Sequence, residues 1–344
     1  MQSTGVRIAL VGLDHWYSAF PFAAAVAAHD GATLVAVADT APERAREVAR
    51  RNGVERVPTR WEEIVEDPEI DAIASFISVD RNPEVCIAAA RSGKHILSIK
   101  PLALTLPDAT AIREAVHQAG VVFLPAESRG RLAEQNQRLK QWLAEGRLGR
   151  VLTASFSLWA GIPQRWPGDP DPGWFADAQR APGGGWIDHS IYHIDLLRWL
   201  LGSEAQGVSG RAGNLKYPDL PVEDFGTATV TFEDGVIATL EDTWLAQPGA
   251  FRTTMSLVGT AGIVAYDSLS GRLSVAGDFP PFSGWVQTAP LATHTEGLDH
   301  FLAAIRGDEE AVATVEDAWR NLAVCRAFYE AAASGSIITP ANIP

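Results

Sequence analysis

The sequence predicts an α/β fold in which a doubly wound parallel sheet is followed by an α+β domain with a large, open, mainly antiparallel sheet. The first third of the chain alternates short apolar runs with helical patterns, which is typical of parallel sheets with right-handed crossovers. Later strand patterns follow one another across short turns, which favours antiparallel pairing. The length of 344 residues suits two domains.

The parallel sheet is predicted from five apolar runs, at residues 6–12, 33–39, 72–79, 95–98 and 121–125. The first run closes on Gly12, and the second ends in the carboxylate of Asp39. Helical patterns separate the strands, at residues 20–29, 42–52, 83–92 and 106–119. Pro42 occupies a first-turn position, where a helix tolerates proline well.

The pattern changes near Glu127, so we place the domains at residues 1–126 and 127–344. The second domain opens with a helix at 132–144 and a strand at 151–159. A loop rich in Pro, Gly and Trp follows at 161–185, and loops of this length are usually functional or mobile. The remaining predicted elements are a helix at 187–201, strands at 225–232, 236–244, 252–258 and 262–267, and helices at 297–306 and 315–333.

Composition argues against several classes of partner. Lys and Arg total 28 against 42 Asp and Glu, and this net charge of −14 repels nucleic-acid phosphates and anionic membranes. No apolar run reaches the ~18 residues of a membrane span, and no leader pattern precedes the first strand. Cys86 and Cys325 lie in apolar helical patterns and are expected to be buried thiols. We therefore expect a soluble, cytoplasmic protein.

The turn after the first strand carries a partial dinucleotide fingerprint, Gly12-Leu13-Asp14-His15-Trp16-Tyr17. In the full fingerprint three glycines allow the turn, the approach of a pyrophosphate and close helix packing. Only the first glycine remains here, since Asp14 and Tyr17 stand in the other two places. The candidate cofactor-binding residues of this turn are Gly12, Leu13, Asp14, His15 and Trp16.

Asp39 ends the second strand, where a carboxylate suits hydrogen bonding to the adenosine ribose hydroxyls. It would repel a 2′-phosphate, so the sequence favours NAD over NADP in a Rossmann-type domain. The alternative is that Asp39 stabilises the N-terminus of the helix that begins at Pro42.

Lys100 and Pro101 follow the strand at 95–98, at the sheet edge where ligands of such folds bind. A lysine held in a cleft can lower the pKa of a substrate hydroxyl or relay its proton. The alternative is a solvated surface lysine.

Three glycines at 183–185 release the long loop into a helix that carries Asp188 and Tyr192 on one face, four residues apart. His189 and His193 form a second such pair on a neighbouring face. This pair could bind a metal, but no matching third ligand is apparent, so we expect no metal. A histidine that is hydrogen-bonded inside the domain interface is the alternative.

Together these features resemble the Gfo/Idh/MocA family, over nearly the whole chain. The markers are Gly12, the strand end Val37-Ala38-Asp39, residues 90–97 leading to Lys100-Pro101-Leu102-Ala103, and then residues 146–151, 174–177, 188–199, 259–262 and 316–335. The resemblance implies NAD(P)-dependent oxidation or reduction of a sugar or polyol. It also implies that Lys100 is the catalytic lysine, that Asp188 opens the catalytic helix motif, and that Tyr192 stands at the place of the motif's histidine.

On this resemblance Tyr192 is assigned as the proton donor and acceptor, with Lys100 lowering its pKa, and Lys100 and Pro101 join the cofactor-binding set. Ile99 replaces the motif's glutamate, and residues 78–82 lack the usual pattern that lines the cofactor cleft. These departures, like Asp14 and Tyr17, all lie in the part of the expected site that binds the dinucleotide.

The main hypothesis is therefore an oxidoreductase acting on a carbohydrate, with Lys100, Asp188, His189, Tyr192 and His193 near the substrate. Trp159, Trp166 and Trp174 are candidates for stacking on sugar rings, or alternatively pack within their own loop. Two other functions stay open: glycoside cleavage through transient oxidation by tightly held NAD, and a non-catalytic sugar- or partner-binding protein. The resemblance also implies a homodimer or homotetramer formed through the open sheet.

Overall fold

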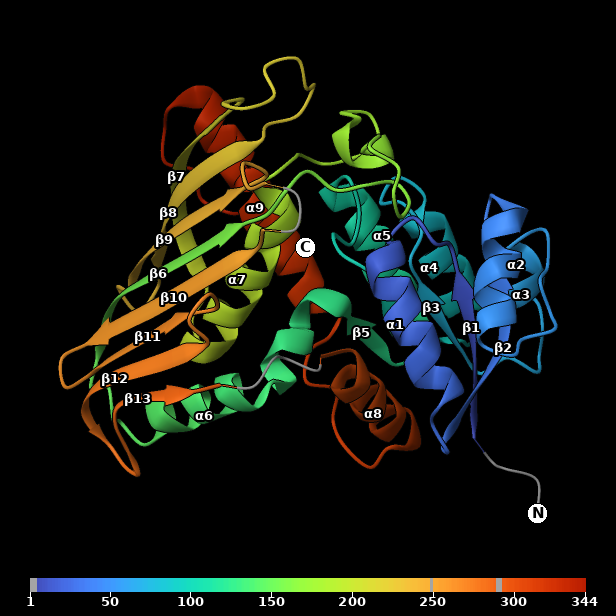
Figure 1. Ribbon diagram of the computed structural model, residues 1–344, viewed down its shortest axis with the longest axis horizontal. Helices are drawn as coiled ribbons and strands as arrows, with labels where there is room; N and C mark the ends of the chain where they lie inside the picture. Colours follow the sequence, from blue (N-terminus) through green and yellow to red (C-terminus); the bar gives the residue numbers. More distant parts are fainter. Residues whose placement is uncertain (1–4, 248–249, 289–292) are drawn as a thin grey trace.

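A five-stranded parallel sheet forms the first part of the computed structural model, which describes residues 5–247, 250–288 and 293–344 (Figure 1). Its strands run in the order β2-β1-β3-β4-β5. The strand order therefore reverses at β1, because β2 lies on one side of it and β3, β4 and β5 lie on the other. Ligands of doubly wound sheets bind beyond the carboxyl ends of the strands at such a reversal. The strands are β1 (Val6–Val11), β2 (Ala32–Ala38), β3 (Ala72–Ser75), β4 (His95–Ser98) and β5 (Phe123–Pro125).

Helices cross between these strands as the alternating pattern predicts. Their bounds are α1 (Trp16–Ala27), α2 (Pro42–Arg51), α3 (Glu62–Val65), α4 (Asn82–Arg91) and α5 (Leu106–Ala119). The short 3-10 helix η1 (Ala126–Leu132) then leads out of the sheet into α6 (Glu134–Ala144).

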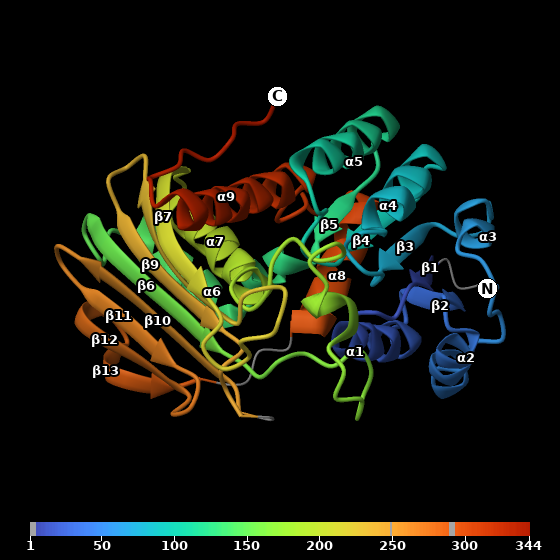
Figure 2. The same cartoon turned by 90° about the horizontal axis from the view of Figure 1, so that it is seen from above.

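The second sheet has eight strands in the order β13-β12-β11-β10-β6-β9-β8-β7, with only the β6–β9 pair parallel among the pairings described. Helices α6, α7 (Ile187–Leu201) and α9 (Val315–Ser334) lie against one face, and no helix of the described residues covers the other (Figure 2). The strands are β6 (Val151–Trp159), β7 (Ala205–Gly213), β8 (Phe225–Phe232), β9 (Ile237–Thr243), β10 (Arg252–Gly259), β11 (Ile263–Asp267), β12 (Arg272–Phe279) and β13 (Phe282–Gln287). The predicted fold class is confirmed.

Several elements differ from the prediction. Strand β7 was not expected because glycines at 207, 210 and 213 lower its strand propensity. Strands β12 and β13 and the one-turn helix α3 were also missed, and β3 ends at Ser75 rather than at residue 79. Helix α1 begins at Trp16, four residues earlier than predicted, so the aromatic side chains of the partial fingerprint lie on a helix.

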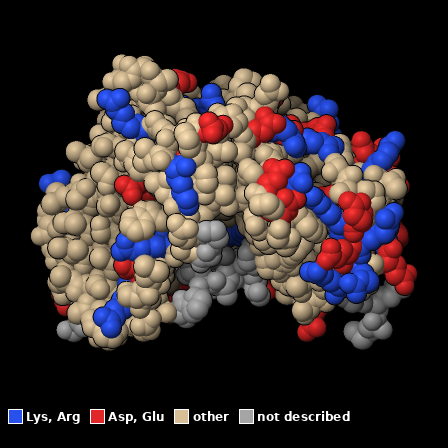
Figure 3. All heavy atoms as spheres, turned by 45° about the horizontal axis from the view of Figure 1, so that its top comes forward, with Lys and Arg blue, Asp and Glu red and all other residues tan. Residues whose placement is uncertain are grey.

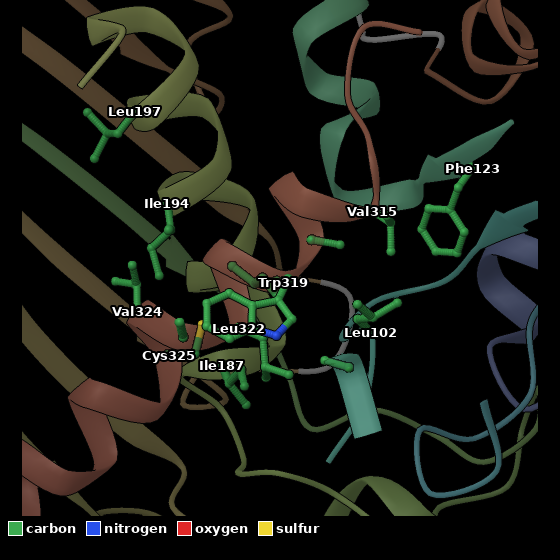
Figure 4. Packing of buried hydrophobic residues seen from close by; sticks show 14 of the residues in the cluster. Leu102, Phe123, Ile187, Ile194, Leu197, Val315, Trp319, Leu322, Val324 and Cys325 are labelled. Carbon is green, nitrogen blue, oxygen red and sulfur yellow. The ribbon is translucent and has the colours of Figure 1, made fainter. Parts of the chain in front are cut away.

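Helix α9 joins the two sheets into one hydrophobic core (Figure 4). Trp319 is buried among residues of both parts, with Leu102 and Phe123 on one side and Ile187 on the other. Its indole N–H also donates to Thr110 Oγ1 of α5 at 2.9 Å. The orientation of the two sheets is therefore fixed by packing rather than by a flexible linker.

Helix α8 (Thr293–Arg306) follows the second sheet in the chain but returns to the first one. Its residues Leu298, Phe301 and Leu302 belong to the core that contains Phe22 and Val26 of α1. The division at residues 126 and 127 stays a proposal, with α8 as a segment that crosses back over it.

A buried carboxylate fixes α7 against the linker η1. Asp195 accepts hydrogen bonds from Arg131 Nε at 2.8 Å, Arg131 Nη2 at 2.6 Å and Ser128 Oγ at 2.8 Å. Asn321 of α9 donates to the same carboxylate at 2.9 Å. Because Asp195 and Arg131 are at most 5% exposed, loss of either would strand a buried charge.

The surface charges, the helix lengths and the cysteines relate to the predictions made from composition. Acidic and basic side chains are interspersed over the first sheet's surface in Figure 3, whereas uncharged atoms dominate the visible surface of the second part. No helix within the described residues is long and apolar enough to cross a bilayer. Cys86 and Cys325 are buried free thiols, which confirms the prediction.

Replacement of Asp195 tests the buried ion pair. Asp195→Ala should lower the free energy of unfolding by about 3–5 kcal/mol, because it leaves the Arg131 guanidinium buried without its main partner. Urea denaturation measures the loss. The matched control is Glu134→Ala, which removes the exposed pair with Arg138 and should cost less than about 1 kcal/mol. Equal losses in both variants would contradict the role given to Asp195.

Candidate active site

A buried ion pair joins the two parts of the molecule. Lys100 lies just beyond β4, and Asp188 lies in the first turn of α7. The Lys100 ammonium donates to Asp188 Oδ1 at 2.5 Å and also to the Asp188 backbone carbonyl. The lysine side chain is 2% exposed, which excludes the alternative of a solvated surface lysine.

The triple-glycine turn sets the position of Asp188. The backbone N–H groups of Gly184 and Trp186 donate to the buried carboxylate of Glu223 at 2.9–3.1 Å. A side chain at Gly184 is excluded, because its Cβ would lie 2.0 Å from the Glu223 carbonyl oxygen. Helix α7 therefore starts at a fixed point, with the Asp188 carboxylate in its first turn, where the helix dipole favours negative charge.

Asp188 and Lys100 face a cavity of about 530 Å³ that His189 and Tyr192 also line. The Lys100 ammonium lies 5.1 Å from the centroid of the Tyr192 ring. Trp16 and Tyr17 of α1 complete this part of the wall. The structure thus brings together four of the predicted substrate-side residues, contributed by both parts of the chain.

The pair holds both charges at neutral pH. Burial alone would lower the pKa of Lys100, but the Asp188 carboxylate raises it overall. Burial would likewise raise the pKa of Asp188, but the Lys100 ammonium, followed by His189, lowers it overall. Burial lowers the pKa of the His189 imidazole, which is therefore neutral at pH 7.

The expected effect of Lys100 on Tyr192 has the predicted sign but is outweighed. Burial raises the pKa of the Tyr192 phenol, and the opposing charge of Lys100 does not compensate. Lys100 therefore lowers the pKa of Tyr192 as predicted, but burial keeps that pKa above its usual value. Tyr192 is a protonated phenol at neutral pH.

A second, smaller cavity of about 190 Å³ lies at the switch between β1 and β3, lined by Gly12, Asp39, Thr40 and Trp61 among others. Gly12 has φ +79°, and a Cβ there would lie 2.5 Å from Ile77 Cα, so the turn after β1 requires glycine. The cavity fits the adenosine end of a dinucleotide, because it combines this turn with a carboxylate at the end of β2.

The Asp39 carboxylate is placed for both of its expected roles, which are binding a ribose and stabilising the N-terminus of α2. Its carboxylate accepts from Leu13 N at 2.7 Å and from Ala41 N, just before α2, at 2.8 Å. Burial raises the pKa of Asp39 to about 6. The side chain both braces the fingerprint turn and lines the cavity.

Aromatic side chains fill the space around the altered fingerprint. His15 is fully buried, with ring centroids 4.8 Å from Trp174 and 5.5 Å from Phe175 of the long loop. The Asp14 carboxylate accepts from Ser78 N at 2.8 Å, and so ties the turn after β1 to the turn after β3. Pro101 is buried beside Lys100.

The loop at 161–185 is tied across the first domain. Trp16 donates its indole N–H to the Gln164 carbonyl at 2.7 Å, and Arg180 donates to the Asp80 carboxylate at 3.0 Å. Trp166 packs against Phe20, with their ring centroids 5.3 Å apart. Neither Trp166 nor Trp174 lines the larger cavity, so their place agrees with the alternative of packing by the loop.

Two other candidates lie away from the cavity. Trp159 is 41% exposed on the sheet and donates its indole N–H to Glu241 at 3.1 Å. His193 is buried, and its Nδ1 lies 3.2 Å from Asp242 Oδ2, as expected for a hydrogen-bonded interior histidine. Within the part of the chain that the structure describes, no three His, Cys, Asp or Glu side chains are grouped to hold a metal.

Three further residues of this region were not predicted from the sequence. Trp244 donates its indole N–H to Asp188 Oδ2 at 3.0 Å, and so occupies the oxygen that Lys100 does not bind. Tyr17 lines the cavity, although its position drew notice only as a lost glycine. Glu127 is 2% exposed, and burial raises its pKa to about 7. Nothing local in the sequence marks Trp244, because it lies 56 residues from Asp188.

The chain matches two family descriptions. Residues 6–127 match "Oxidoreductase family, NAD-binding Rossmann fold", and residues 136–265 match "GFO/IDH/MocA C-terminal domain". It is 32% identical over 317 residues to 1,5-anhydro-D-fructose reductase of Ensifer adhaerens, covering 89% of this chain and 90% of that protein. It is 29% identical to scyllo-inositol 2-dehydrogenase (NAD(+)) of Bacillus subtilis, over 93% and 92% of the two chains.

Solved structures share the fold. Levoglucosan dehydrogenase in complex with NADH superposes with a TM-score of 0.85 at 24% identity, over 98% of this chain and all of that one (100%). An oxidoreductase domain protein from Kribbella flavida gives the same score at 20% identity.

Trp244→Phe tests whether the indole orients Asp188. We expect kcat to fall by about tenfold, since a hydrogen bond to a charged group contributes roughly 1.5–3 kcal/mol. The dissociation constant for NAD should not change. Steady-state kinetics and calorimetry measure the two effects.

Trp186→Phe is the matched control, because this indole is equally buried near the start of α7 and its N–H has no hydrogen-bond partner. It should keep its kcat. A similar fall of kcat in both variants would mean that Trp244 acts through packing alone.

Proposed function

The chain belongs to the Gfo/Idh/MocA family of NAD-binding oxidoreductases, and we propose that it transfers hydride between NAD and a secondary hydroxyl or carbonyl group of a sugar, polyol or related carbohydrate. The observation that carries the proposal is the convergence of Lys100, Asp188 and Tyr192 on one cavity. These groups can bind an alcohol oxygen and move its proton, which hydride chemistry requires.

The cofactor would be held by residues on both sides of the fingerprint turn. Gly12 and Leu13 provide a backbone that approaches closely, and Asp39 suits the ribose of NAD better than the 2′-phosphate of NADP. Asp14 is already paired with the Ser78 N–H, so its charge is partly compensated. When bound, NAD supplies the group that accepts or returns the hydride.

In this proposal Lys100 and Tyr192 act on the substrate oxygen and its proton. The Lys100 ammonium, fixed by Asp188, stabilises negative charge on the substrate oxygen as a carbon–hydrogen bond breaks or forms. The Tyr192 phenol, protonated at neutral pH, donates to a carbonyl oxygen during reduction. The phenolate form that this step leaves is the group that takes the proton back during oxidation. Asp188 acts by orienting the lysine, and His189 by binding substrate hydroxyls.

A second candidate is glycoside cleavage through transient oxidation by NAD that never leaves. The contacts of the loop 161–185 across the first domain support it, because Trp16–Gln164 and Arg180–Asp80 would oppose release of a dinucleotide. Cofactor that co-purifies with the protein, without formation of free NADH on turnover, would favour this candidate.

The open face of the second sheet is the proposed site of self-association into a dimer or tetramer. It presents exposed apolar side chains that a monomer would leave in water, among them Trp159 at 41% and Ile237 at 48% exposure. The buried free thiols of Cys86 and Cys325 agree with the proposed cytoplasmic location.

Loss of Lys100 tests the proposed chemistry. Lys100→Met, combined with Asp188→Asn so that no buried charge is left alone, should lower turnover by about 10²–10⁴-fold, the range typical of a proton-transfer group. Affinity for NAD should change little. Calorimetric titration with NAD⁺ and NADP⁺, followed by an NADH fluorescence assay on sugars and polyols, provides both measurements.

Unchanged turnover in the double variant would remove Lys100 from the mechanism. Absence of NAD⁺ and NADP⁺ binding by the wild-type protein, with no cofactor co-purifying, would instead favour a non-catalytic binding protein.

Ile237→Lys tests the proposed interface. A lysine within an apolar contact should convert a dimer or tetramer into monomers in light scattering, because burying an unpaired charge is costly. Leu215→Lys is the control, since Leu215 is 66% exposed and lies outside the sheet. A monomeric wild-type protein would refute the proposal.

A further inference from the structure

Away from the polar groups at Lys100, and apart from Tyr17, Gln164 and Tyr217, the wall of this cavity is largely apolar. Residues 160–164 follow β6 and contribute Ile162 and Pro163, and the segment before β10 contributes Phe251. Tyr217 adds a further ring from the loop after β7. A polyol alone, with hydroxyl groups on every side, would leave much of this surface without matching groups.

The cavity also offers no free charge among the described residues that line it. Lys100 and Asp188 are its charged side chains, and they neutralise each other. Lys216, next in sequence to Tyr217, directs its ammonium to the carbonyl oxygens of Leu245 and Ala246, at 3.2 and 2.9 Å. A phosphate or carboxylate on the ligand would find no unpaired cation there, so the cavity suits an uncharged molecule.

An exposed aromatic ring points to a ligand larger than one sugar ring. The cavity of about 530 Å³ lies within the range of sites for drug-sized molecules, roughly 300–1,000 Å³, and a bound nicotinamide ring would share this space with the substrate. The Phe251 ring is 54% exposed, although it lies only 6.2 Å, centroid to centroid, from the His189 ring. An aromatic side chain held open beside catalytic groups provides a surface on which an apolar ligand group can pack.

We infer that the substrate is an uncharged glycoside with an apolar, aromatic aglycone. The inference rests on the proposed function and specifies its substrate class. The sugar ring lies at Lys100, Asp188 and Tyr192, and the aglycone packs against Phe251, Ile162 and Pro163. In the reaction a secondary hydroxyl of the sugar becomes a carbonyl group: its carbon-bound hydrogen leaves as hydride to NAD⁺, its O–H proton passes to the phenolate form of Tyr192, and the glycosidic bond stays intact.

Matched pairs of methyl and phenyl glycosides test the inference. Both anomers of the glucosides, galactosides and mannosides are assayed by NADH formation, together with the free sugars. For the sugar and anomer that react, the phenyl glycoside should have a kcat/KM about tenfold above that of the methyl glycoside, which corresponds to burying one face of a phenyl ring.

Phe251→Ala should bring this ratio close to one, because it removes the ring against which the phenyl group packs. Trp285→Ala, which removes an equally exposed aromatic ring (53%) from β13, should preserve the ratio. The dissociation constant for the phenyl glycoside is measured by calorimetry on the Lys100→Met/Asp188→Asn variant. It should rise by the same factor, about tenfold, when Phe251→Ala is added.

The outcomes separate this inference from the function on which it rests. Activity on free sugars or methyl glycosides with no gain from a phenyl group would overturn the inference and leave the proposed function standing. A phenyl preference that survives Phe251→Ala would also overturn it. No NADH from any sugar or glycoside, by a protein that binds NAD⁺, would overturn both.

Discussion

The buried pair of Lys100 and Asp188 is the constraint on which the site depends. A lysine and a carboxylate that are both nearly inaccessible to water can coexist only if each stays beside the other, since either charge alone would be strongly destabilising. The pair therefore requires the end of β4, in the first sheet, and the start of α7, which packs on the second sheet, to lie at a fixed distance from each other. The glycine turn, the indole of Trp244 and the packing of α9 are the means by which the chain meets this requirement.

The dinucleotide side of the molecule keeps the turn but not the bare backbone of the usual fingerprint. Gly12 and Asp39 retain their places at a small cavity, whereas Asp14 and Tyr17 stand where glycines usually stand, and His15 and Trp16 add rings beside them. Trp16 and Tyr17 line the substrate cavity, and His15 packs against Trp174 and Phe175 of the long loop. The altered motif thus contributes to contacts between the domains as well as to the nucleotide site.

The sequence predicted the fold well where periodicity is strong, as in the five buried strands and the long helices α5, α7 and α9. It missed β7, whose three glycines hide its strand character, and β12 and β13. Lys100, Asp188 and Tyr192 could be predicted because a family pattern fixes their spacing. Trp244, Tyr17 and Phe251 could not, since each acquires its role from a partner that only the folded chain brings near. The places of Trp166 and Trp174 agree with the alternative of packing by the loop.

The return of α8 to the first sheet limits how this protein can be divided. Leu298, Phe301 and Leu302 cover α1, so a fragment ending at residue 126 would leave the apolar side of that helix in water. Such a fragment would aggregate rather than serve as a portable nucleotide module. Recombination with a relative would have to exchange α8 together with the N-terminal sheet. The two stretches form one structural unit despite the length of chain between them.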